Sequence, residues 1–222
     1  MTNSIKTILA AVFLLFALMP ARAQKHFQPN IAVGGKAGVT LSKVNFSPGV
    51  KQGWNMGQTA GATFRYMEEK HFGLIVEALI TRAGWKENFE DARFNYSRTL
   101  TYLQLPILTH IYFGNNRFRG FFNMGPRIGF ALSESTDANL NGTNPSPNRP
   151  DTQHELPIQK KFDWGLCGGP GIELRTPIGY FLLEGRFNLS LSNIYNSHKG
   201  DTFSKSANQV ITAKLTYLIP LK

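Results

Sequence analysis

The sequence predicts an all-β fold, an eight-stranded antiparallel transmembrane β-barrel preceded by a cleaved signal peptide. Three observations lead to this prediction. The chain begins with an export signal, strand-like segments recur along the rest of it, and the connections alternate between short turns and long polar loops. Bacterial outer-membrane barrels have an even number of strands, with short turns at the periplasmic end and longer loops at the outer end.

Residues 1–23 are expected to be a secretory signal peptide, which leaves residues 24–222 as the barrel domain. A basic start precedes an apolar run from Ile8 to Met19, and the run ends at the small-x-small site Ala21–Ala23. This pattern is typical of a cleaved export signal, and the run is too short for a comfortable membrane-spanning helix. An uncleaved N-terminal anchor is the alternative. An exported chain would go to the periplasm, the cell exterior or an outer membrane.

Eight segments with strand-like alternation follow the signal. Most are longer than the five or six residues usual in soluble proteins, and a tilted membrane strand needs about nine to eleven. The predicted strands are 31–42, 56–67, 72–84, 99–113, 118–133, 162–176, 180–191 and 209–221.

The connections between the predicted strands alternate between short and long. Short turns join the second strand to the third, the fourth to the fifth and the sixth to the seventh, whereas 85–98, 134–161 and 193–208 are long and polar. An extracellular sandwich has no reason to sort its loops in this way. We therefore expect the three long segments to be external loops and the short turns to be periplasmic.

The segment YFLLEGRFNLSL (180–191) shows how the two faces differ. Leu183, Phe187 and Leu189 alternate with Glu184 and Arg186. Successive side chains of a strand point to opposite faces, and a charge on a lipid-facing surface costs a few kcal/mol near the midplane. The apolar face is therefore predicted to meet lipid and the charged face to line the lumen.

The same reasoning predicts a charge network in the lumen. Its predicted members are Lys36, Arg65, Glu77, Arg127, Asp163, Glu173, Arg175, Glu184, Arg186 and Lys214. Gln104, His110 and Arg119 are also expected to point inward. For Glu184, Arg175 and Lys214 are the expected partners, because they lie on the neighbouring strands.

Three residues carry narrower expectations. Cys167 is the single cysteine, so an intrachain disulfide is excluded, and we expect a small buried residue rather than a reactive thiol. Pro106 and Pro126 lie inside predicted strands, where proline removes a ladder donor. A closed barrel has no free edge, so bulges or local kinks are expected at both prolines.

The segments YLQLPILTHIYFGN and FFNMGPRIGFAL, together with GGKAG at 34–38, resemble the PorT-like outer-membrane β-barrel proteins of Bacteroidetes. Tyr102, Leu103 and Pro106 match the family pattern of the fourth strand, whereas Gln104 and His110 replace its usual acid and lysine. The likeness covers most of the chain after the signal, and its motifs mark architecture rather than chemistry. It implies an outer-membrane location in a Gram-negative bacterium. The namesake of the family is implicated in exporting proteins to the cell surface, whereas most members have no assigned activity.

Three functions fit the sequence. The first is a non-catalytic barrel with a lumen filled by side chains and external loops that bind partners, because eight strands leave little interior space. The second is a narrow pore, which would prefer anions because Lys and Arg outnumber acids among the inward positions. The third, less favoured, is a lipid A-modifying enzyme, which needs His, Ser and an acid within reach of each other; His154 and His198 are the loop candidates.

The partners are expected to belong to the cell envelope. The formal charge is +10, but the basic residues are scattered and the chain is exported, so nucleic acid is not expected. Outer-membrane lipid, the phosphates of lipopolysaccharide and proteins of an envelope or secretion complex are the expected partners. No metal-ligand spacing is present, and neither a metal nor a cofactor is expected.

Overall fold

The computed structural model describes residues 29–140, 154 and 156–221. The predicted signal peptide, its cleavage site and part of the predicted loop 134–161 lie outside the described residues. The strands are β1 (Asn30–Ser47), β2 (Gln52–Gly53), β3 (Asn55–Glu69), β4 (Phe72–Glu87), β5 (Asn95–Gly114), β6 (Phe118–Asn139), β7 (Phe162–Thr176), β8 (Gly179–Ser190) and β9 (Lys205–Leu221).

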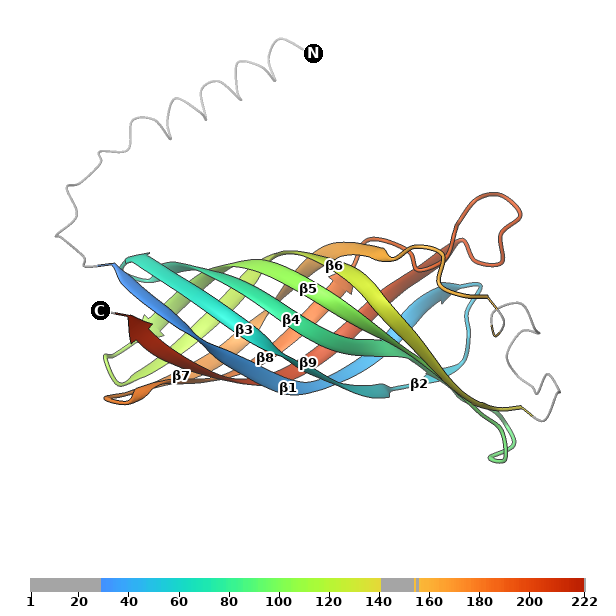
Figure 1. The fold of residues 1–222 in the computed structure, drawn as a ribbon, viewed down its shortest axis with the longest axis horizontal. Helices are drawn as coiled ribbons and strands as arrows, with labels where there is room; N and C mark the ends of the chain where they lie inside the picture. The colour runs from blue at the N-terminus through green and yellow to red at the C-terminus, as the bar shows by residue number, and fades with distance from the viewer. Residues whose placement is uncertain (1–28, 141–153, 155, 222) are drawn as a thin grey trace, which may run out of the picture.

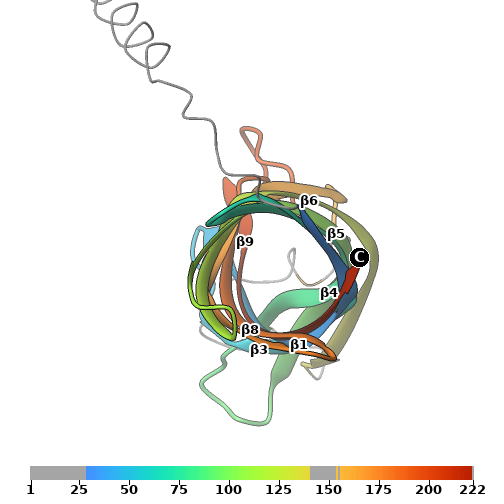
Figure 2. The ribbon, with the colours of Figure 1, turned by 90° about the vertical axis from the view of Figure 1, so that its left-hand side faces the viewer.

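The eight long strands close into an antiparallel barrel (Figures 1 and 2). Around the barrel they follow the order β4-β3-β1-β9-β8-β7-β6-β5, and β4 also pairs with β5. The fragment β2 only adds two residues beside the outer end of β4. Closure leaves none of the long strands with an unpaired edge. The predicted eight-stranded barrel is confirmed.

Several strands run further than predicted at the long-loop end. β4 continues to Glu87, β5 begins at Asn95, β6 continues to Asn139 and β9 begins at Lys205. Each long loop is therefore shorter than expected. The extensions carry polar outward residues, as in the pair Ser97 and Asp137, so the alternation of apolar residues that marks the lipid band is missing there.

Bulges or local kinks were expected at the two prolines, and the expectation of bulges was wrong. The register of β5 with β6 is the same at Leu105↔Ile128 as at Thr109↔Met124, although pairing lapses at Ile107 and Leu108. The recorded register shift lies instead between Thr101 and Tyr102. Gly125 explains the close approach near Pro126, because a Cβ there would lie 2.0 Å from the Ile107 carbonyl oxygen.

The two faces of the strands differ as the alternation predicts. On β8, Leu183 is 53% exposed and Phe187 46%, whereas Glu184 is 2% and Arg186 1%. The outer wall is therefore apolar and the charges point into the lumen. Leu182, the apolar exception on the polar face, packs inside near the short turns, with Met67 and Phe121 among its neighbours in a small buried cluster.

Within the described part of the chain, no helix is long and apolar enough to cross a membrane.

Candidate functional site

A cluster of buried charges occupies the middle of the lumen. Glu77 on β4 and Glu184 on β8 each contact both Lys36 on β1 and Arg186 on β8. Arg186 Nη1 lies 2.7 Å from Glu77 Oε2, and Arg186 Nη2 lies 2.8 Å from Glu184 Oε1. Lys36 Nζ is 3.0 Å from Glu184 Oε2 and also binds Glu77. The cluster is a closed ring in which each carboxylate bridges both cations.

The Arg186–Glu77 pair crosses the lumen. In the order of strands around the barrel, β4 and β8 are four positions apart in either direction, so they face each other. An ion pair between them can form only if the two side chains meet near the barrel axis. An eight-stranded barrel is narrow enough for this contact.

Two further contacts join opposite strands. Arg65 Nη1 on β3 lies 2.7 Å from Glu173 Oε2 on β7, and Asn208 Nδ2 on β9 donates to the Tyr102 hydroxyl on β5 at 3.0 Å. We call these two contacts and the Arg186–Glu77 pair the cross-lumen contacts. Both partners of each are buried, so the lumen is bridged at three places along the barrel.

Arg127 and Asp163 form a more local pair on the neighbouring strands β6 and β7. Arg127 Nη1 lies 2.8 Å from Asp163 Oδ2. Ser192 donates to the other oxygen of Asp163 at 2.6 Å, and Arg127 Nη2 is bonded to Ser190 Oγ at 2.5 Å. Ser190 at the end of β8 and Ser192 just beyond it thus hold the carboxylate and the guanidinium together.

Neither residue expected to pair with Glu184 forms a close ion pair with it. Lys214 stands opposite Glu184 in the β8–β9 register, but within the described residues it forms no ion pair shorter than 4 Å. Arg175 instead places its Nε 3.1 Å from Glu173 Oε1. The expectation considered the adjacent strands alone, whereas the observed partners of Glu184 are Arg186 on the same strand and Lys36 on β1, two strands away.

A hydrogen-bonded chain leads from the central ring toward the short turns. Asn123 Nδ2 donates to Glu184 Oε1 at 2.9 Å, which leaves Asn123 Oδ1 as the acceptor for His110 Nδ1 at 2.7 Å. These contacts place the proton of a neutral His110 on Nδ1. His110 and Gln104 both point inward, as predicted.

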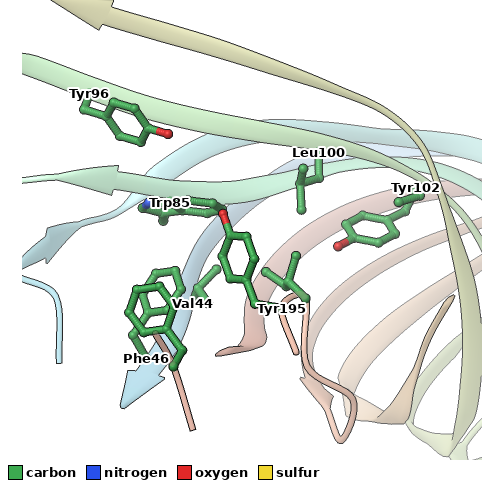
Figure 3. Close-up of a cluster of buried hydrophobic side chains, with 10 residues drawn as sticks. Val44, Phe46, Trp85, Tyr96, Leu100, Tyr102 and Tyr195 are labelled. Atoms are coloured by element: carbon green, nitrogen blue, oxygen red, sulfur yellow. The ribbon is translucent and has the colours of Figure 1, made fainter. Parts of the chain in front are cut away.

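An apolar plug fills the long-loop end of the lumen (Figure 3). The plug is the cluster of buried residues Val44, Phe46, Trp85, Tyr96, Leu100, Tyr102, Ala131, Ile194, Tyr195 and Phe203. It combines residues of β1, β4, β5 and β6 with residues of the loop between β8 and β9. The rings of Phe46 and Trp85 meet edge to face at 5.3 Å between centroids. Each of the ten side chains is at most 7% exposed.

Arg98 ties the plug to the loops, and the sequence reasoning missed it. Its Nη1 donates to the Tyr195 hydroxyl at 2.9 Å and to the Leu156 carbonyl, and its Nη2 donates to the His154 carbonyl at 3.1 Å. Arg98 was placed in a loop because its segment is polar, yet it lies on β5 with the inward parity of Leu100 and Tyr102. That parity is the signal that could have identified it.

The two loop histidines have acidic neighbours. His154 Nε2 lies 3.1 Å from Glu87 Oε2, and His198 Nδ1 lies 3.3 Å from Asp201 Oδ2 on an exposed turn. Among the residues that the structure describes, neither imidazole is hydrogen-bonded to a serine hydroxyl. Within the same residues, no group of three His, Cys, Asp or Glu side chains is arranged to hold a metal ion.

A closed barrel of long tilted strands, with an apolar outer wall and a charged interior, defines a transmembrane β-barrel protein. The family model for the outer membrane protein beta-barrel domain matches residues 22–196. The chain belongs to this family. It is a small outer-membrane barrel of a Gram-negative bacterium, in contact with the lipid of that membrane.

Solved structures of small outer-membrane proteins are similar to this chain. OprG from Pseudomonas aeruginosa is 14% identical, with a TM-score of 0.48 and coverage of 87% of this chain and 97% of OprG. Ail from Yersinia pestis is 12% identical, with a TM-score of 0.43 and coverage of 85% of this chain and 99% of Ail. Outer membrane protein W from E. coli is 16% identical, with a TM-score of 0.40 and coverage of 88% of this chain and 100% of that protein. No curated protein matches the sequence. These distant likenesses add nothing about function, and the fold rests on the strand pairing.

Proposed function

We propose that the protein is a non-catalytic, PorT-like barrel of the Bacteroidetes type whose external loops bind envelope proteins and assist the export of proteins to the cell surface. Its lumen serves as a rigid, closed scaffold rather than as a passage. Lipopolysaccharide and components of a secretion complex are the proposed partners. The resemblance of the fourth and fifth strands to that family suggests the export role.

The cross-lumen contacts carry the proposal. Arg65–Glu173, Arg186–Glu77 and Asn208–Tyr102 each occupy the barrel axis with buried side chains. The plug adds an apolar seal at the long-loop end. A scaffold closed in this way leaves the loops as the surface on which partners can act, since functional residues concentrate on loops held by a rigid frame.

Electrical recording tests the closed lumen. We expect the purified barrel in planar bilayers to carry no steady current under applied voltage. The double variant Glu77→Ala with Arg186→Ala removes one cross-lumen contact but leaves the other two and the plug, so it should also carry no steady current. A steady anion-selective current through the unmodified barrel would contradict the closed scaffold and favour the narrow pore.

Co-purification tests the binding role. The loop between β4 and β5, residues 88–94, would be replaced by a Gly-Ser linker of equal length, and the barrel recovered from crosslinked outer membranes. A matched control replaces the turn 115–117 at the opposite end. We expect envelope proteins to be recovered with the unmodified chain and the turn variant and to be lost with the loop variant. Recovery of the same proteins with both variants would contradict binding through this loop.

The absence of catalysis is tested by mass spectrometry of lipid A. The spectrum should be identical in cells with and without the protein. A new or missing acyl chain or phosphate that depends on His154 or His198 would instead establish an enzyme.

A further inference from the structure

Three arginines converge at the short-turn end of the lumen. Arg65 comes from β3, Arg119 from β6 and Arg175 from β7, and all three lie around Glu173 of β7. Glu173 is fully buried, and its two oxygens are already engaged: Arg65 Nη1 and Nη2 lie 2.7 and 3.4 Å from them, and Arg175 Nε lies 3.1 Å away. This group carries three positive charges and one negative charge.

Arg119 is the one of these three arginines that forms no ion pair with the Glu173 carboxylate. It stands directly opposite Glu173 in the β6–β7 register and interacts electrostatically with Glu173, Arg175 and Arg65. Nevertheless, its guanidinium lies over the Tyr112 ring, 4.3 Å from the centroid, and its Nε donates to the Asn115 carbonyl at 3.3 Å. Its Nη1 is buried and has no acceptor in the part of the chain that the structure describes.

The other two arginines have spare donors as well. Arg65 Nε is buried without an acceptor among the described residues, and Arg175 Nε lacks hydrogen-bond geometry to Glu173 despite the short distance. A buried donor without a partner costs about 1 to 3 kcal/mol, and more when it is charged. Native structures satisfy such groups with protein, water or a bound ion.

The central ring offers a contrast. There two carboxylates, Glu77 and Glu184, meet Lys36 and Arg186, with Lys214 as a third cation nearby. Positive charges exceed negative charges by one in the ring and by two at the short-turn end. The short-turn end is also reachable, because the Arg175 side chain is 15% exposed, whereas that of Arg186 is fully buried.

We propose that the short-turn end of the lumen is a binding site for one small oxyanion, with Arg119 as its principal ligand and Arg65 and Arg175 as supporting ligands. A guanidinium presents a planar fork of donors that matches carboxylate and phosphate oxygens. Two excess positive charges are balanced by one dianion of the phosphate type. The three arginines face the lumen and not the lipid, so the ligand comes from solution at the end of the barrel that carries the short turns.

Calorimetric titration of the full chain, recovered from outer membranes in a non-ionic detergent, tests the site with inorganic phosphate as the probe. We expect saturable binding of one phosphate per barrel at low salt, weakened by added chloride. Arg119→Gln should reduce the affinity about tenfold, which corresponds to the loss of one charge-assisted hydrogen bond. Arg119→Lys should retain part of the affinity, because it keeps the charge but loses the fork.

Arg117→Gln is the matched control. Arg117 lies two residues before Arg119, on the turn between β5 and β6, is exposed, and loses the same charge on substitution. It should change the affinity less than twofold. Heat-modified migration in gels shows that each variant is folded. The site is refuted if the folded, unmodified barrel shows no saturable phosphate binding. It is also refuted if Arg117→Gln and folded Arg119→Gln weaken binding equally, because that result would reflect diffuse charge.

Discussion

The two ends of the lumen are closed by different chemistry. At the long-loop end, ten buried residues form an apolar plug, and Arg98 donates hydrogen bonds to the Tyr195 hydroxyl and to loop carbonyls. At the short-turn end, three arginines surround the single carboxylate of Glu173, which pairs with Arg65 and Arg175 but not with Arg119. The short-turn end also has a small apolar cluster, which includes Tyr112, Phe121 and Leu182, but Arg119 next to it keeps a buried donor without an acceptor among the described residues. Packing therefore accounts for the long-loop end, whereas the short-turn end combines packing with the unpaired donors on which the proposed oxyanion site depends.

The largest effect is expected in the ring between the two ends. Glu77→Leu removes a carboxylate that bridges Lys36 and Arg186 and leaves two buried cations underpaired, so stability should fall by about 4 kcal/mol. Urea unfolding of barrels refolded in lipid vesicles measures the loss. The double variant Glu77→Leu with Arg186→Met should cost less than the single one. An equal or greater cost for the double variant would show that the ring is not held by charge pairing.

The plug should be nearly as sensitive. Trp85 is fully buried and packs on Phe46, so Trp85→Ala should lower the free energy of unfolding by about 3 kcal/mol. Trp54→Ala is the control, because Trp54 is 48% exposed and a surface substitution costs about 0.5 kcal/mol or less. The same urea assay applies. If the two variants lost equal stability, the long-loop end would not be sealed by packing.

A smaller effect is expected on the outer wall. Leu183→Glu puts a carboxylate on the lipid face and should cost about 2 kcal/mol, whereas Phe187→Leu keeps that face apolar and should be mild. Unfolding in vesicles compares the two variants. A harmless Leu183→Glu together with a damaging Phe187→Leu would mean that the assigned faces are reversed.

The smallest effect is a pH dependence of the plug. Burial raises the pKa of the Tyr195 hydroxyl above its ordinary value, despite the opposing effect of Arg98. Because the folded pKa exceeds the unfolded one, the contribution of Tyr195 to stability is complete below about pH 10 and is lost as the pH rises through the folded pKa. Tyr195→Phe should therefore reduce the loss of stability at alkaline pH, as measured by urea unfolding. An identical alkaline profile in both proteins would contradict a buried Tyr195.

The alternation of residues was enough to predict which face each strand turns to the lumen. Leu183, Glu184 and Arg186 illustrate this, because charge cannot remain in lipid and a strand has only two faces. The partner of each charge could not be predicted. Glu184 pairs with Lys36 and Arg186 rather than with Arg175 or Lys214. Long side chains reach along their own strand and past the adjacent strand, and the alternation of residues does not reveal these distances.

The alternation of apolar and polar residues also did not predict how far β4, β5, β6 and β9 extend at the long-loop end. Arg98 was assigned to a loop since the strands around it leave the lipid band, and polar residues then appear on both faces. The short-turn cluster was partly predicted, because Arg65, Arg119, Glu173 and Arg175 were all expected to point inward. That Arg119 has no carboxylate partner follows only from the register, which places it opposite Glu173, and from the contacts of Glu173 with Arg65 and Arg175.

The cross-lumen contacts also constrain the order of assembly. Arg65 and Glu173 are 108 residues apart in the chain, and Glu77 and Arg186 are 109 apart. Opposite walls face each other only after the sheet has curled, so these pairs form late, when most strand pairing is complete. Contacts absent from the rate-limiting step of folding slow unfolding rather than speed folding. We therefore expect the pairs at the barrel axis to slow the unfolding of an assembled barrel without speeding its insertion.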